Sequence, residues 1–151
     1  MTTSKQQLGD WGENLVAKTQ ACPKCKRTDS RTLRLLPTNF KCSDIICDFC
    51  GFLAQVKTTT IKSQGGFPSS VLGAAWKPQF ERMQSGIYFS LYLVLTDKAR
   101  SFSEIYYLPS ELQSRELFVP RKPLSNTAKR AGWQGFLLNT KDHADLFVKL
   151  S

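Results

Sequence analysis

The stretch DIICDFCGFLAQVK at positions 44–57 decides the fold of this chain. Its middle holds a Cys-x-x-Cys pair, Cys47 and Cys50, and 21 residues separate it from a second such pair, Cys22 and Cys25. This spacing is typical of a four-thiolate zinc site, because each pair bends back to present two sulfurs to one tetrahedral ion. Four thiolates would close the coordination shell, so we expect the zinc to be structural.

Two disulfides, or five unrelated buried thiols, are the alternative interpretation of the cysteines. The first ten residues are polar, and no apolar run has the length of a secretory signal core or a membrane span. We therefore expect a reducing, cytoplasmic location, where structural disulfides do not persist. The fifth cysteine, Cys42, fits neither pair and is expected to be a small buried side chain in a strand.

The composition is that of one folded domain with an unusually basic surface. The 151 residues are 41% apolar and 22% charged, which excludes wholesale disorder and a membrane protein. Twenty-one Lys and Arg against 12 Asp and Glu give a net charge of +9, which favours a polyanionic partner, nucleic acid before membrane lipid. A solvated basic surface that binds nothing is the alternative.

Hydrophobic periodicity predicts an α/β fold with a mixed sheet. The apolar spacing indicates a helix over residues 3–20 and a second over residues 72–84, which Pro78 would interrupt. A nearly continuous apolar run over residues 87–95 indicates a central strand that is buried on both faces. The other expected strands cover residues 31–36, 39–46, 51–60, 103–108, 135–139 and 146–150.

The strand over residues 51–60 carries the polar groups that suggest chemistry. Gln55 and Lys57 share one face under the two-residue period, and Asp44 stands near the end of the preceding strand. Oxygen ligands suit Mg²⁺, so Asp44, the Gln55 side chain and the backbone carbonyl of Val56 are candidate ligands for phosphodiester cleavage. Lys57 could hold the attacking water or stabilise phosphate charge. Ordinary polar positions on an edge strand are the alternative.

Two separated parts of the chain resemble the DpnI-like restriction endonucleases, which are zinc-containing members of the PD-(D/E)XK nuclease superfamily. The first part contains CPKC at 22–25, DIICDFC at 44–50 and QVK at 55–57, and the second contains RKPL at 121–124 and TAKRAGW at 127–133. The likeness extends over about residues 10–140. It implies one nuclease domain over residues 1–151, with a restriction-endonuclease-like mixed central sheet flanked by helices and a zinc knuckle formed by 22–25 and 47–50.

The resemblance also implies an activity and assigns roles. It implies a Mg²⁺-dependent endodeoxyribonuclease that cleaves double-stranded DNA, of the type II restriction class. Asp44 matches the metal-binding aspartate and Lys57 the catalytic lysine, while Glu13 is the candidate for the glutamate of the first helix. Gln55 stands where the family has a glutamate, so the site has one fewer negative charge and is expected to bind Mg²⁺ more weakly. For Glu13, an ordinary surface carboxylate is the alternative.

Two segments are candidate DNA contacts. The Gly- and Ser-rich loop after the strand over residues 51–60 contributes Lys62 and Ser69, and the basic segment near the C-terminus contributes Arg121, Lys122, Asn126, Lys129 and Arg130. The family's adenine-methyl dependence is not carried over here, because the resembling enzyme also reads methylated DNA with a separate winged-helix domain. Monomer and homodimer both remain open. A catalytically inactive zinc-ribbon DNA-binding module and a structure-specific nuclease of repair or transposition are the alternative functions.

Overall fold

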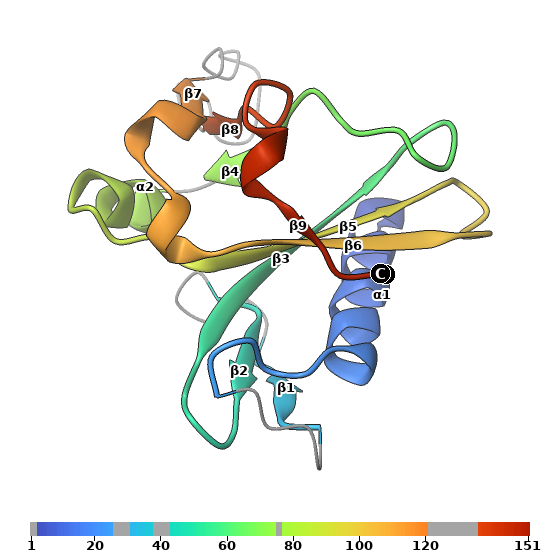
Figure 1. The fold of residues 1–151 in the computed structure, drawn as a ribbon, viewed down its shortest axis with the longest axis horizontal. Coiled ribbons are helices and arrows are strands. Elements are labelled where there is room, and N and C mark those ends of the chain that lie inside the picture. Colours follow the sequence, from blue (N-terminus) through green and yellow to red (C-terminus); the bar gives the residue numbers. More distant parts are fainter. Residues whose placement is uncertain (1–2, 26–30, 38–42, 75–76, 121–135) are drawn as a thin grey trace.

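The computed structural model describes residues 3–25, 31–37, 43–74, 77–120 and 136–151, and its centre is a six-stranded mixed sheet (Figure 1). The strand order is β1-β2-β3-β5-β6-β9. Only β3 and β5 pair in parallel, over seven residue pairs, while the other neighbours are antiparallel. The strands are β1 (Leu33–Leu35), β2 (Ile45–Cys47), β3 (Leu53–Thr60), β5 (Ser90–Thr96), β6 (Ser103–Leu108) and β9 (Val148–Lys149).

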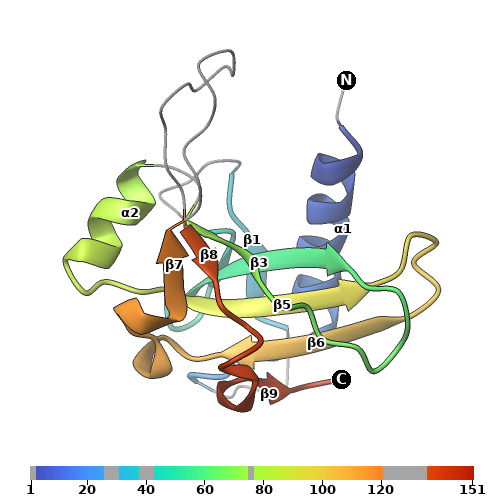
Figure 2. The same cartoon turned by 90° about the horizontal axis from the view of Figure 1, so that it is seen from above.

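Within the described ranges, a smaller antiparallel sheet and two helices accompany the large sheet (Figure 2). The small sheet has the order β4-β8-β7, with β4 at Val71–Ala74, β8 at Phe136–Leu138 and β7 at Phe118–Pro120. Helix α1 covers Ser4–Thr19 and α2 covers Lys77–Gln84, and the two lie on opposite sides of the molecule (Figures 1 and 2). Short 3₁₀ turns cover Ser110–Leu112, Arg115–Leu117 and Ala144–Leu146.

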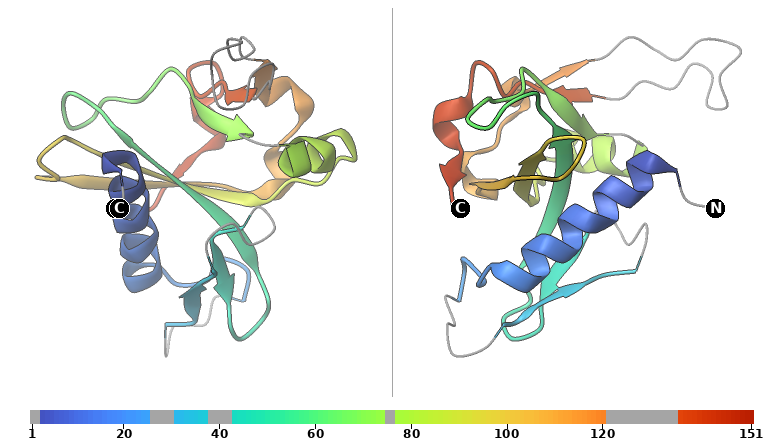
Figure 3. Two further views of the ribbon diagram at one scale, coloured as in Figure 1. Left: turned by 180° about the vertical axis from the view of Figure 1, so that it is seen from behind. Right: turned by 90° about the vertical axis from the view of Figure 1, so that its right-hand side faces the viewer.

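Helix α1 packs across one face of the large sheet (Figure 3). It begins at a capping box, in which Thr3 accepts from the Gln6 amide and Gln6 accepts from the Thr3 amide. Gly12 allows the close approach to β3, because an ideal Cβ at this position would lie 1.8 Å from Thr58 Oγ1. Any larger residue at position 12 would therefore push α1 away from β3.

The hydrophobic core has two parts, one on each face of the large sheet. The first lies under α1 and includes Val16, Ala54 and Tyr92, and the second lies under the small sheet and includes Leu93 and Leu138. Every residue of β5 is buried, which confirms the prediction of a central strand covered on both faces. The predicted mixed α/β architecture is likewise confirmed.

Two elements differ from the sequence predictions. Residues 72–84 were expected to form one helix, but residues 71–74 form β4 and the helix begins only at Lys77. Pro78 is its second residue, where the missing N–H needs no partner and the ring conformation favours helix initiation. Strand β7 was not predicted, because a three-residue strand that ends in proline has no recognisable period. Residues 38–42, with Cys42, lie outside the described part of the chain.

Among the described residues, no helix combines the length and the apolar character that crossing a membrane would need.

Candidate functional site

The four predicted cysteines gather at the base of β3. Their sulfur atoms all lie within 4.8 Å of one another, with 3.6 Å between Cys22 and Cys50 and 3.8 Å between Cys25 and Cys47. A tetrahedron of thiolates at ~2.3 Å from zinc has an edge of ~3.8 Å, which matches these separations. The donor set and its geometry therefore fit a structural zinc ion.

Backbone turns and a hydroxyl hold the second cysteine pair in place. The Cys50 amide lies 3.5 Å from Cys47 Sγ, and the Gly51 amide donates to the Cys47 carbonyl at 2.9 Å. Gly51 has a φ of 81°, a left-handed conformation that glycine adopts without strain, and it reverses the chain into β3. The Thr32 hydroxyl lies 3.1 Å from Cys47 Sγ. The turn that carries Cys47 and Cys50 is therefore the turn that joins β2 to β3.

The thiols of the cluster differ in acidity. Burial raises the pKa of Cys22 to about 12. Burial also acts on Cys47, but hydrogen bonds from the Thr32 hydroxyl and the neighbouring amides outweigh it and lower the pKa of Cys47 to about 6. Zinc binds thiolates, so its binding must release the proton of Cys22.

Asp44 is fixed where β2 begins. Its amide donates to the Ala54 carbonyl and its carbonyl accepts from the Leu36 amide, both at 2.9 Å. Its Oδ2 accepts from the Val56 amide at 2.8 Å, so the side chain lies against the edge of β3. Burial raises the pKa of Asp44, opposed by the Val56 hydrogen bond and by the charge of Lys57. A half-buried carboxylate is a suitable cation ligand.

The Val56 carbonyl points toward the same edge as Asp44. In an extended strand the N–H and C=O of one residue face the same side, and the Val56 N–H faces Asp44. The pairing of β2 with β3 covers only Ala54 and Leu53 on β3, so Val56 lies just past the last pair. Beyond this last pair the Val56 N–H meets the Asp44 side chain, and the Val56 carbonyl faces the same side of β3.

Glu13 and Lys57 lie within electrostatic reach of Asp44. Burial raises the pKa of Glu13 to about 7, with further contributions from the negative charges of Asp44 and Asp10, while Lys57 acts in the opposite direction. The structure thus brings together Glu13 of α1, Asp44, which directly precedes β2, and Lys57 of β3, although 44 positions separate the first and last in the chain. Gly12 makes this approach possible, because it seats α1 on Thr58.

Gln55 is more deeply buried than Asp44. It is buried, with 9% of its surface exposed, and lines a small cavity with Arg82, Met83 and Tyr88. The strand alternation puts it on the same face of β3 as Lys57. Its alternative as a solvent-facing polar residue of an edge strand is wrong, because β3 lies between β2 and β5 and the side chain is buried.

The predicted DNA contacts divide into two groups. Lys62 and Ser69 are exposed on the connection between β3 and β4, where the Ser69 carbonyl accepts from the Lys141 amide at 3.1 Å. The remaining predicted contacts, Arg121, Lys122, Asn126, Lys129 and Arg130, lie outside the described residues.

Sequence reasoning missed two structural contributors to the site. Gly12 seats the helix that carries Glu13, and an interior helix glycine, which costs stability without a packing reason, was the available signal. Thr32 holds Cys47 from the neighbouring strand segment, and no spacing rule reports such a contact.

A model of the DpnI (Dam-replacing) family matches residues 2–145. The chain belongs to this family, which places it among nucleases of the restriction type and makes DNA the substrate class. The match spans both the cysteine cluster and the group around Asp44.

Proposed function

We propose that this protein is a Mg²⁺-dependent endodeoxyribonuclease that cleaves double-stranded DNA as a type II restriction enzyme. The observation that carries the proposal is the convergence of Glu13, Asp44 and Lys57 beside the Val56 edge of β3. Two carboxylates and a lysine beside one strand form the group that metal-assisted phosphodiester cleavage needs. The DpnI family match supports the same reaction.

Asp44, the Gln55 side chain and the Val56 carbonyl are the oxygens that we propose to hold Mg²⁺. Bound there, the cation would polarise the scissile phosphate and acidify a water molecule. Gln55 contributes no charge, so the Glu13 carboxylate supplies the second negative charge near the site. Asp44 is held in its orientation by the Val56 amide, so it needs no rearrangement to bind.

Lys57 acts on the reacting groups through its positive charge. Its charge acts on both Asp44 and Glu13 and lowers the pKa of each. A fixed ammonium group can orient the attacking water and stabilise the charge that develops on the phosphate. Residues of β3 thus supply both a metal ligand and the charge that stabilises the transition state.

The zinc cluster acts as a brace in this proposal. Cys47 ends β2 and Cys50 stands three residues before β3, so one ion would fix the turn between the two strands that hold Asp44 and Lys57. No position in a four-thiolate shell remains open for substrate.

A catalytically inactive zinc-ribbon DNA-binding module is the second candidate, and Gln55 is the observation that favours it. The buried neutral amide replaces the carboxylate that the family pattern has at this position. A site with weakened Mg²⁺ affinity could retain DNA binding without cleavage.

Plasmid cleavage in Mg²⁺ or Mn²⁺ tests the proposal. Wild type is compared with Lys57→Ala and with Lys98→Ala, a control that removes an exposed lysine from the turn between β5 and β6. The nuclease is supported if wild type and Lys98→Ala cleave the plasmid and Lys57→Ala does not. If all three proteins bind DNA and none cleaves it, the inactive module is correct. Plasmid prepared with and without adenine methylation then tests whether recognition is methylation-directed.

A further inference from the structure

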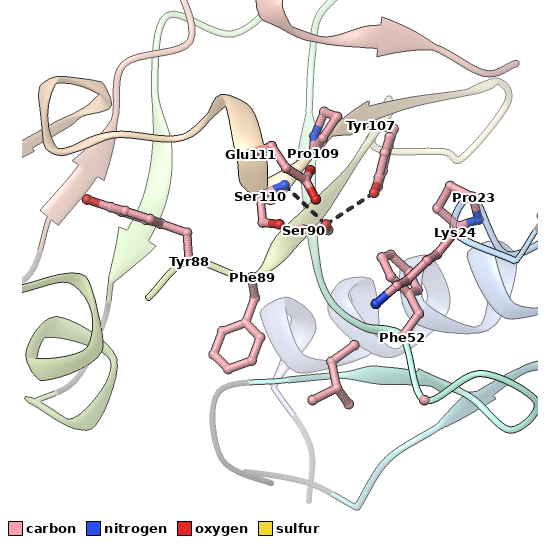
Figure 4. A pocket seen from close by; sticks show the side chains of 12 residues that line it. Pro23, Lys24, Phe52, Tyr88, Phe89, Ser90, Tyr107, Pro109, Ser110 and Glu111 are labelled. Carbon is pink, nitrogen blue, oxygen red and sulfur yellow. Dashed lines mark hydrogen bonds between the residues drawn. The ribbon is translucent and has the colours of Figure 1, made fainter. Parts of the chain in front are cut away.

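A pocket of about 430 Å³ opens at the start of β3 and β5, beside the cysteine cluster (Figure 4). Its aromatic lining comes from Phe52, Tyr88, Phe89 and Tyr107, and its polar lining includes Ser90 and Glu111. The mechanism proposed above uses none of these side chains. The volume lies within the range of small-ligand sites, ~300–1,000 Å³.

The polar floor of the pocket is organised before any ligand arrives. Ser90 Oγ accepts from the Tyr107 hydroxyl at 3.1 Å and from the Ser110 amide at 3.2 Å. Lys24 and Glu111 reach toward the open space from opposite sides, with the Phe89 ring at its edge (Figure 4). An aromatic surface with one cationic and one anionic group beside it suits a flat, polar, heteroaromatic ligand attached to an anion.

The pocket shares a wall with the small cavity that Gln55 lines. Tyr88 and Phe89 line both this pocket and the small cavity that contains Gln55. The Gln113 amide fixes the shared wall, since its Nε2 donates to the Phe89 carbonyl at 2.7 Å. A group bound in the pocket would therefore lie close to a DNA strand that contacts Gln55 and Lys57.

The cysteine cluster builds the opposite wall. Pro23 and Lys24 stand between Cys22 and Cys25, and Gly51 and Phe52 follow Cys50. Residues of both Cys-x-x-Cys turns therefore face the ligand space. Lys24 lies within the four-residue turn from Cys22 to Cys25.

We propose that this pocket receives one unpaired nucleobase of the DNA substrate, which it takes out of the base stack; this inference rests on the proposed function. Phe89 supplies a stacking surface, and Lys24 contacts a phosphate next to the base. Glu111 accepts a hydrogen bond from an N–H group on the exposed edge of the base. The net charge of +9 suits a polyanionic strand.

Binding of two fluorescent duplexes tests the inference. One duplex carries a single bulged 2-aminopurine, and the other has the same sequence with that base paired. Titrations contain no Mg²⁺ and no chelator, so that neither cleavage nor zinc loss contributes. We expect the bulged duplex to bind about tenfold more tightly, the order of one base–aromatic stack, with quenching of the 2-aminopurine emission.

Two variants test the pocket against a matched control. Phe89→Leu keeps an apolar side chain but removes the ring, and Glu111→Gln keeps the shape but removes the charge. Leu112→Ala is the control, because Leu112 is exposed on the same 3₁₀ turn as Glu111 and does not line the pocket. Phe89→Leu should bind both duplexes equally and Glu111→Gln should show a reduced preference, because the glutamine oxygen accepts a weaker hydrogen bond than a carboxylate, whereas Leu112→Ala should keep the preference. Circular dichroism verifies that each variant is folded.

The outcomes distinguish this inference from the proposed nuclease. Equal binding of both duplexes by wild type, together with cleavage of paired plasmid, overturns the base pocket alone. A preference for the bulge without any cleavage in Mg²⁺ or Mn²⁺ supports the pocket and overturns the nuclease. Binding of neither duplex overturns both. A preference that persists in Phe89→Leu and in Glu111→Gln places the base elsewhere and also overturns the pocket.

Discussion

The two candidate metal sites of this protein lie along the same strand but are built in opposite ways. The cysteine cluster before β3 comes from two short turns, each of which supplies two sulfurs within four residues. The group around Asp44 takes one side chain from α1, one from the residue before β2 and one from β3. The first can form from local chain geometry, whereas the second exists only after three elements have packed. We therefore expect the geometry of the second site to depend on the first.

Removing zinc should have the largest effect, because we expect the group around Asp44 to depend on the cysteine cluster. We expect a strong chelator to abolish the folded circular dichroism spectrum and to release about one zinc per chain, as measured with a colorimetric indicator. Cys47→Ser should reproduce the loss. A protein that stays folded without zinc would show that the packed core, not the ion, holds the turn between β2 and β3.

Asp44→Asn should separate chemistry from structure at the second site. The amide oxygen can still accept from the Val56 N–H, while the negative charge is lost. We expect cleavage to fall by about 10²- to 10³-fold with little change in the unfolding midpoint. Unfolding curves and plasmid cleavage rates measure the two effects. A large loss of stability instead would mean that Asp44 holds β2 to β3 through its charge.

Gly12→Ala should show how far the second site depends on packing. The added Cβ meets Thr58 Oγ1, so we expect a loss of about 1–3 kcal/mol in the free energy of unfolding and weakened cleavage. Gly9→Ala is the matched control in the same helix, because no atom lies within 4 Å of its added Cβ, and it should be stabilising. Denaturant titration compares the two. Equal stabilities would refute the close approach of α1 to β3.

Glu13→Gln should have the smallest effect and should depend on pH. The pKa of Glu13 is raised to about 7, so the folded state binds more protons than the unfolded state between about pH 4.5 and 7. The wild type therefore loses stability as pH rises through this window. We expect Glu13→Gln to be about 1 kcal/mol more stable at pH 8 in Mg²⁺-free buffer and to gain nothing at pH 4, the small value reflecting partial exposure. A gain that is independent of pH would contradict the proximity of Glu13 to Asp44.

The same contrast explains what the sequence could predict. The two Cys-x-x-Cys pairs, the central strand β5 and the strand faces of Gln55 and Lys57 follow from spacing, because each is a local property of the chain. The boundary between β4 and α2 does not, since an apolar run near Pro78 fits a strand followed by a helix as well as one long helix. The burial of Gln55 depends on α2 and on Tyr88, which lie far from it in sequence.

The functional grouping required more than periodicity. Glu13 was predicted from a family resemblance, and its proximity to Asp44 depends on how closely α1 packs on β3. That close approach requires the absence of a Cβ at Gly12, a steric detail that no hydrophobic pattern contains. The pocket beside the cysteines was not predicted at all, because its walls come from four separate stretches of chain.

The parallel pairing of β3 with β5 has a consequence for the order of folding. Strands β1, β2 and β3 are antiparallel neighbours along the chain, but Ala54 pairs with Ser90 across 36 positions of sequence. Closing such a long loop is slow compared with forming adjacent strand pairs. We therefore expect a refolding chain to form β1, β2 and β3 with the cysteine cluster first. The pocket that Ser90 lines should form last, so that zinc uptake precedes nucleic-acid binding in time.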